Sequence, residues 1–281
     1  MNYEEFCQQQ VAPLGSTEYY TLYSLSPAER AAALAIKAFH KSIQDVSHTC
    51  SDAQVAETKF NWWQQEIKQL FSGTAQHPIT QALQPVIQAH SLDQSLFLDL
   101  IAGIKKNAEY NAYHSAAELI QHAHRASHAK MQLLATVFGH KHASTLEFAH
   151  DLGIGLALFE SVYTMRKDLQ KGNVYFPTED LQKFDLTANK LLDTSDATAV
   201  NALLRLQDER ITTFFQKALK HLEKSEHYKQ RSLLIEQRLT TALLDLLKPN
   251  LAAVLSAHIQ LTPLKKLYIA WRTVRNAKKY S

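Results

Sequence analysis

The sequence contains few of the residues that interrupt helices. Its 281 residues include 7 glycines and 7 prolines, where average usage would give roughly 20 and 14. Alternating apolar and polar runs, which indicate half-buried strands, are almost absent, as are Asn-Gly and Asp-Gly hairpin turns. No internal repeat or low-complexity linker divides the chain. The sequence therefore predicts an all-α protein with one domain of about ten helices.

Cysteine and long apolar runs are also scarce. The two cysteines, Cys7 and Cys50, are too few for a disulfide framework and lack metal-site spacing, which favours a reducing compartment. No run reaches the roughly 18 apolar residues that a membrane-spanning helix requires. Residues 1–15 include Glu4 and Glu5 and show no basic start followed by an apolar run, unlike a signal peptide. We therefore expect a cytoplasmic protein, with peripheral attachment at the inner face of the membrane still allowed.

An excess of one charge is confined to the C-terminal end of the chain. The 30 Lys and Arg residues oppose 27 Asp and Glu residues, and the net charge of +3 gives no reason to expect a nucleic acid partner. No acidic residue follows Asp245, whereas seven basic residues do: Lys248, Lys265, Lys266, Arg272, Arg275, Lys278 and Lys279. This last segment carries +7, and the rest of the chain carries −4.

The end of the chain also has an amphipathic pattern. Apolar residues from Thr262 onward recur at helical spacing, namely Leu264, Leu267, Tyr268, Trp271 and Val274. A basic amphipathic helix can lie on an anionic membrane. The same stripe can instead pack on the body of the protein and leave a solvated basic face. Contact of the segment Thr262 to Ser281 with a membrane surface is therefore one of two expectations.

Capping signals predict several helix boundaries. A serine followed three residues later by Glu or Gln and an apolar run indicates a helix start, as at Ser26, Ser51, Ser91, Ser115 and Ser144. Thr262-Pro263 places a proline at a first helical position. A glycine after a periodic run indicates a helix end, as at Gly73, Gly139 and Gly172.

Several segments match a known pattern. The first are STEYYTLYSLSPAERAAALAIKAFH at residues 16–40, WWQQEI at 62–67 and HPITQAL at 77–83; later ones are DLGIGLA at 151–157 and GNVYFPTEDL at 172–181. Together they resemble the squalene/phytoene synthase family, from about Ser16 to Trp271. The resemblance implies an isoprenoid-synthase-like bundle around a central pocket, with residues 1–15 as a lead-in and 16–281 as the family-like domain.

Enzymes of that family condense two prenyl diphosphates head to head with Mg²⁺, which is held by two aspartate motifs on facing helices. Carboxylates spaced i, i+4 share one helix face, and Mg²⁺ prefers carboxylate and phosphate oxygens. In this sequence the corresponding positions carry uncharged residues at Gln44, His48 and Thr164. The resemblance therefore implies a relic diphosphate and metal site without an assigned catalytic residue: Lys41, Gln44, Asp45, His48, Thr164 and Asp168.

Other positions that the resemblance assigns to the pocket have also changed. Its pocket residues here are Tyr20, His122, Glu160 and Tyr175. His122 stands where a tyrosine is usual and Glu160 where an asparagine is usual, while Asn107, Ala157 and Asn173 depart from the pattern too. Lys41, Tyr175 and Pro177 are retained.

These substitutions leave two hypotheses and a variant of the first. The chain resembles the non-catalytic branch of the family, which is similar to complex I assembly factors, in its lost motifs, its Lys106-Asn107 pair and its Ala270-Trp271-Arg272 helix. That likeness implies a binding or assembly-type factor with a protein partner or prenyl lipid and no cofactor. A related version of this hypothesis is a carrier or sensor of a prenyl lipid. The alternative is a prenyltransferase with a reduced Mg²⁺ site at Asp45 and Asp168, since Mg²⁺ can be held by one or two carboxylates with water and phosphate.

The spacing of the histidines and aromatic residues favours ordinary packing. His124 and His128 are spaced i, i+4 on a predicted helix near His122, and His140 and His142 follow it. A zinc site needs three or four ligands, and no HExxH motif or cysteine pair is present. Aromatics at helical spacing usually fill cores, and core packing is therefore favoured over cavity contacts for Tyr19, Tyr20, Tyr23, Phe60, Trp62 and Trp63.

Overall fold

The computed structural model describes residues 2–50, 52–110, 112–192 and 197–280. The helix start expected at Ser51, and the outer limits Met1 and Ser281 of the expected domain ranges, lie outside the described residues. The described residues contain no strand, and only Tyr113 and Pro177 form an isolated bridge. They form 14 α-helices and short 3₁₀ turns, and the all-α prediction is therefore confirmed.

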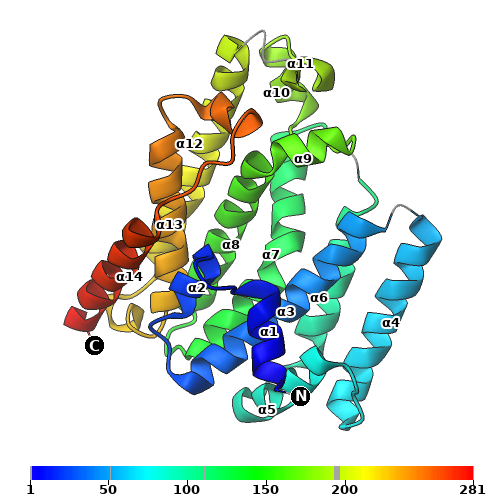
Figure 1. The fold of residues 1–281 in the computed structure, drawn as a ribbon, viewed down its shortest axis with the longest axis vertical. Coiled ribbons are helices and arrows are strands. Elements are labelled where there is room, and N and C mark those ends of the chain that lie inside the picture. The colour runs from blue at the N-terminus through cyan, green and yellow to red at the C-terminus, as the bar shows by residue number, and fades with distance from the viewer. Residues whose placement is uncertain (1, 51, 111, 193–196, 281) are drawn as a thin grey trace.

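The helices run through the described chain in the order of Figure 1: α1 (Tyr3–Val11), α2 (Thr17–Leu22), α3 (Pro27–Thr49), α4 (Ala53–Ser72), α5 (Pro78–His90), α6 (Gln94–Asn107), α7 (Ala116–Phe138), α8 (Ser144–Tyr163), α9 (Met165–Gln170), α10 (Thr178–Lys183), α11 (Ala188–Leu192), α12 (Ala197–His221), α13 (Arg231–Leu247) and α14 (Pro263–Ala277). The number exceeds the expected ten because α2, α9, α10 and α11 have only five or six residues each. Such short helices lack a full amphipathic period and leave little sequence signal.

Helices α7 and α8 form the centre of the bundle (Figure 1). α8 packs along both α7 and α12, while α3 packs against α1, α5 and α7. Helix α1 belongs to the expected lead-in of residues 1–15, yet it packs on α3 and α5 and buries Cys7. Within the described residues, no helix combines the length and the apolar character needed to cross a bilayer.

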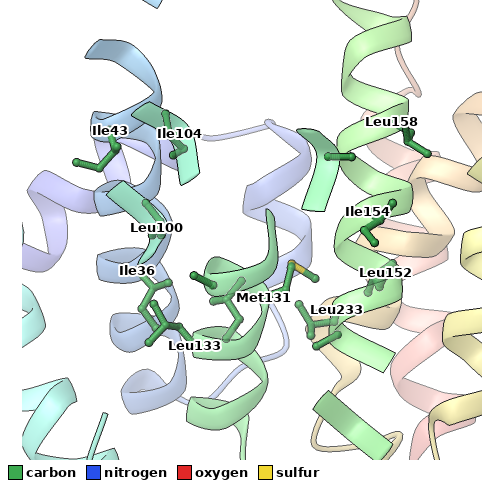
Figure 2. Close-up of a cluster of buried hydrophobic side chains, with 14 of the residues drawn as sticks. Ile36, Ile43, Leu100, Ile104, Met131, Leu133, Leu152, Ile154, Leu158 and Leu233 are labelled. Atoms are coloured by element: carbon green, nitrogen blue, oxygen red, sulfur yellow. The ribbon is translucent and has the colours of Figure 1, made fainter. Parts of the chain in front are cut away.

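Buried aliphatic side chains connect these helices into one core. Figure 2 labels residues of α3, α6, α7, α8 and α13 that point toward one another: Ile36, Ile43, Leu100, Ile104, Met131, Leu133, Leu152, Ile154, Leu158 and Leu233. All are at most 4% exposed. Burying each such side chain stabilises the fold by about 1.5–3 kcal/mol. This packing holds the helices in fixed positions relative to one another.

Two glycines of the DLGIGLA segment allow α8 to approach its neighbours. A Cβ atom on Gly155 would lie 2.6 Å from the ring of Phe215 on α12, and one on Gly153 would lie 2.8 Å from Met131 on α7. Real Cβ atoms do not approach other atoms so closely, so larger residues would force the helices apart. This segment, which carries part of the family resemblance, is therefore a packing motif in the structure.

The capping predictions succeed where one side chain decides the boundary. Ser26 and Glu29 form the predicted capping box of α3, and Ser115 caps α7. Gly73 and Gly139 end α4 and α7 with positive φ angles. The prediction at Ser91 is wrong. Ser91 ends α5 in the left-handed conformation, and Asp93 caps α6 instead by accepting a hydrogen bond from Ser95.

Candidate functional site

A cavity of about 630 Å³ lies between α3, α7, α8 and α13. Residues of the α1–α2 region, of the segment before α14 and of the first turn of α14 complete its wall, among them Glu18, His258, Leu261 and Lys266. The helices contribute polar as well as apolar side chains to the lining: Lys37, His40, Lys41, Gln44, Asp45 and His48 from α3; Ser127 and Lys130 from α7; Leu156, Phe159 and Glu160 from α8; Glu236, Leu239 and Leu243 from α13.

Helix α3 presents the first group of predicted site residues to this cavity. Lys41, Gln44, Asp45 and His48 all line it, because residues three and four apart share one helix face. The ammonium group of Lys41 donates a hydrogen bond to Asp45 Oδ2 at 2.6 Å. The carboxylate of Asp45 is therefore already engaged by a cation on its own helix.

The second predicted group lies where α8 ends and α9 begins. Thr164 separates the two helices and lines the cavity, whereas Asp168 lies on α9 and is not among the lining residues. The Thr164 hydroxyl donates to Asp168 Oδ2 at 2.6 Å. Lys171, just after α9, donates to the backbone oxygen of His48 at 3.3 Å. This bond joins the end of α9 to the end of α3 and brings the two predicted groups to the same end of the cavity.

These residues do not fit the Mg²⁺ cluster that the resemblance implies. Around this cavity, the described chain holds no set of three carboxylate or histidine ligand atoms within 4.8 Å of one another. At the positions of the missing carboxylates, Gln44 offers an amide, Thr164 a hydroxyl and His48 an imidazole. None of these groups carries negative charge at neutral pH. Mg²⁺ binds chiefly through charged carboxylates and phosphates, and the two remaining carboxylates contact Lys41 and Thr164.

Deeper in the cavity, α3 and α13 are joined by an ion pair. Lys37 Nζ lies 2.9 Å from Glu236 Oε2, and the two side chains are 8% and 14% exposed. Burial opposes both charges and is the largest single influence on each pKa, but the nearby opposite charges and the hydrogen bond between the pair together outweigh it. As a result, the pKa of Lys37 is raised, and the pKa of Glu236 is lowered by Lys37 and Lys130.

Two further charged residues face the cavity without such a partner. In the described part of the chain, the side chains of Lys130 and Glu160 make no hydrogen bond or ion pair. Burial lowers the pKa of the Lys130 ammonium group and raises the pKa of the Glu160 carboxyl group. Both shifts reflect the crowding of protein atoms around a charge in the cavity wall, where Lys130 is half-buried and Glu160 still reaches solvent.

The remaining residues that the sequence assigns to the pocket lie elsewhere. Tyr20 is buried against Ile235 and Leu239, with Lys266 over its ring. His122 and Tyr175 lie with Tyr113 beyond the end of the cavity, where His122 Nδ1 and the Tyr113 hydroxyl form a hydrogen bond. None of these three predicted residues lines the cavity.

The aromatic residues of the N-terminal motifs pack among themselves. Trp63 contacts Phe39, Trp62 and His77 with ring centroids 4.8–5.6 Å apart. Phe60 is fully buried, while Tyr23 and Trp62 are largely exposed. None of them lines the cavity. The expectation of core packing holds for Phe60 and Trp63 and is wrong for the exposed Tyr23 and Trp62.

Sequence reasoning missed the buried charges of the cavity. Lys37 interrupts the apolar run at residues 31–39, and a charge within such a run signals a buried partner. Lys130 and Glu236 carry no comparable local signal, because only the approach of α3, α7 and α13 brings them together.

Comparisons of the sequence with known proteins point to one family. The family model described as squalene/phytoene synthase matches residues 12–265. A 15-cis-phytoene synthase of Synechocystis sp. is 22% identical over 95% of this chain and 84% of its own length. A phytoene synthase of Mycobacterium bovis is 25% identical over 90% of this chain and 84% of its own length.

Solved structures share the fold at lower identity. A dehydrosqualene synthase crystallised with a ligand superposes with a TM-score of 0.79 at 15% identity, over 99% of this chain and 96% of its own. A squalene synthase from Alicyclobacillus acidocaldarius gives a TM-score of 0.66 at 18% identity, over 98% of this chain and 94% of its own.

Proposed function

Because the chain belongs to the squalene/phytoene synthase family, we propose that it keeps the family's binding cavity without catalysing head-to-head condensation. One observation carries this proposal. The carboxylates of Asp45 and Asp168 contact Lys41 and Thr164, and no carboxylate replaces the missing partners at Gln44, His48 and Thr164. A departing diphosphate would lack most of the electrostatic stabilisation that such a reaction needs.

The cavity suits an amphiphilic ligand of the prenyl-lipid kind. Leu156, Phe159 and Leu243 offer apolar surface, while Lys130 and Glu160 offer unpaired polar groups. Lys130 is half-buried, and an unpaired charge that has lost part of its water is costly, so a ligand head group that pairs with Lys130 offsets that cost. In this proposal the protein acts as a binding or assembly-type factor for such a lipid or for a partner that carries it.

Calorimetric titration with farnesyl diphosphate, with and without Mg²⁺, tests this proposal. We expect binding that changes by less than about twofold when Mg²⁺ is added, because the site lacks the ligands for a metal–diphosphate cluster. Asp45→Asn and Asp168→Asn should leave the affinity unchanged, whereas Lys130→Met should weaken it. Binding that requires Mg²⁺ and is lost in Asp45→Asn contradicts a non-catalytic cavity, and no binding under either condition contradicts the proposed ligand class.

The second candidate function is a Mg²⁺-dependent prenyltransferase with a reduced metal site. It is supported by the position of Asp45 in the cavity wall and by the names of the relatives from Synechocystis sp. and Mycobacterium bovis, which are phytoene synthases. Under this function Asp45→Ala and Asp168→Ala abolish turnover. Under the first function these substitutions alter only stability, or nothing.

We also propose that α14 attaches the protein to an anionic membrane surface. Most of its apolar stripe faces outward: Leu264 is 80% exposed and Trp271 is 53% exposed, with Leu267 and Tyr268 also exposed, while Val274 packs on the body. The opposite face packs on the body through smaller and polar contacts at Lys266, Ala270, Thr273 and Ala277. The exposed Lys265 and Arg272 flank the stripe, and such charges complement anionic lipid head groups.

Vesicle flotation measures this attachment. We expect binding to vesicles that contain phosphatidylglycerol. Leu264→Ser combined with Trp271→Ser should bind at least about tenfold more weakly, because two apolar side chains that enter the membrane are lost. Leu246→Ser removes an exposed leucine from α13, 46% exposed, and should have no effect. Equal binding to vesicles of pure phosphatidylcholine, or an effect of the control as large as that of the double variant, contradicts the proposal.

A further inference from the structure

A second cluster of titratable side chains lies outside the cavity, between α7 and α8. His124 and His128 lie one turn apart on α7, and His150 on α8 faces them. One ring nitrogen of each lies within 4.8 Å of the other two. In residues 2–50, 52–110, 112–192 and 197–280, no other set of three His, Cys, Asp or Glu side chains gathers its ligand atoms so closely. The sequence predicted only two of these three residues as neighbours, because the third comes from another helix.

The distances are close to those that one metal ion requires. His124 Nδ1 and His150 Nε2 lie 3.0 Å apart, and the ring centroids are 4.6, 5.0 and 5.3 Å apart. Nitrogen ligands at about 2.0–2.1 Å from a tetrahedral Zn²⁺ lie roughly 3.3 Å from one another. Small rotations of the side chains therefore suffice to bring three imidazoles around one ion.

A buried carboxylate orients one of the three rings. His150 Nδ1 lies 3.2 Å from Asp151 Oδ1, and this aspartate is 1% exposed and also contacts Lys217 at 3.1 Å. When His150 Nδ1–H donates to Asp151, the lone pair of Nε2 points toward His124. Carboxylates hold metal-binding histidines in this way in many proteins.

His128 supplies an independent sign of a missing partner. Its Nδ1 atom is buried and has no hydrogen-bond partner in the described structure. Buried polar atoms are nearly always paired, since an unpaired one costs about 1–3 kcal/mol. A cation bound through this nitrogen would satisfy it.

The cluster is open to solvent and separate from the cavity. A surface groove of about 420 Å³ leads to His124 and His150 and is lined also by Glu118, Gln121 and Ile154. Water can reach a fourth coordination position through this groove. His124 and His128 are on a different face of α7 from Lys130, which lines the cavity.

We propose that His124, His128 and His150 bind a divalent transition-metal ion of the Zn²⁺ or Co²⁺ type, with water as a further ligand. Three imidazole nitrogens favour such ions over Mg²⁺ and Ca²⁺, which prefer oxygen ligands. The site rests on none of the residues that carry the proposed function, and the two proposals therefore stand or fall separately.

Titration of chelator-treated full-length protein with Co²⁺ tests the site, since four-coordinate Co²⁺ absorbs visible light far more strongly than octahedral Co²⁺. We expect one Co²⁺ per chain with the intense spectrum, displacement by Zn²⁺, and no displacement by Mg²⁺. His124→Ala and His150→Ala should each weaken binding by at least about tenfold. His142→Ala removes an exposed histidine outside the cluster and should bind like the wild type.

Two results overturn the proposal. One is the absence of the intense spectrum in the wild type, and the other is unchanged Co²⁺ affinity in both cluster variants. Circular dichroism checks that each variant is folded, and His124→Gln provides a second, more conservative substitution if His124→Ala is not. The Co²⁺ spectrum of the wild type can contradict the site by itself, even if a variant does not fold.

Discussion

Glu236→Ala should destabilise the protein by about 3–5 kcal/mol, because it leaves Lys37 buried without its partner. The pair joins α3 to α13 at 2.9 Å in the wall of the cavity. Lys130 also depends on Glu236, whose charge opposes the lowering of the Lys130 pKa. The measurement is urea unfolding at pH 7, followed by circular dichroism.

The matched controls separate burial from charge alone. Glu57→Gln removes one partner of the exposed pair between Glu57 and Lys105 and should leave the free energy of unfolding nearly unchanged, since exposed pairs contribute little. The double variant Lys37→Met with Glu236→Leu should be less destabilised than the sum of its two single variants, because no partner charge is left behind. A loss of less than about 1 kcal/mol in Glu236→Ala, or strict additivity in the double variant, contradicts the assigned role of the pair.

Acidification from pH 8 to pH 5 should destabilise the protein, with His122 alone contributing about 2 kcal/mol. Burial, aided by Arg125, lowers the pKa of His122 to about 4. Between pH 6.5 and 4 the unfolded chain therefore binds a proton at this imidazole that the folded chain does not. Each drop in pH over this interval therefore lowers the free energy of the unfolded state relative to the folded state, and the free energy of unfolding decreases. Protonation also removes the Nδ1 lone pair that contacts the Tyr113 hydroxyl.

Urea unfolding of wild type and His122→Gln at pH 8 and pH 5 measures this contribution. The variant should lose about 2 kcal/mol less than the wild type over that interval. His142→Gln, at an exposed site outside the aromatic cluster, should keep the wild-type pH dependence. His40 should add to the remaining acid sensitivity, because burial holds its pKa well below the usual value. Equal pH dependence in wild type and His122→Gln would show that His122 is not held neutral by its surroundings.

The fold was predictable where local chemistry determines it. Ser26, Ser115, Gly73 and Gly139 set helix boundaries through a single side chain or a positive φ angle, and such signals are visible in a sequence. The prediction that Ser91 caps α6 was wrong because Asp93, two residues later, caps that helix instead. Serine and aspartate are both good N-cap residues. The choice between them depends on where α5 ends, which is a tertiary effect.

The site was predictable only in part, because spacing along one helix does not fix contacts between helices. Gln44, Asp45 and His48 line the cavity as their i, i+4 spacing suggested. Asp168 does not line it, because the helix is interrupted at Thr164, between α8 and α9.

The sequence also left open which face of α14 packs on the body, because that depends on contacts with other helices. Ala270, Thr273 and Ala277 are small enough for close packing on the body, and Leu264, Leu267, Tyr268 and Trp271 face outward.

The central claim is that this cavity no longer carries out prenyl-diphosphate chemistry, and release of pyrophosphate tests it most directly. Wild-type protein is incubated with farnesyl diphosphate or geranylgeranyl diphosphate and Mg²⁺, with Asp45→Ala run in parallel. The account predicts no pyrophosphate above the protein-free background in either sample. Mg²⁺-dependent release by the wild type that disappears in Asp45→Ala would contradict it and establish the reduced metal site as catalytic.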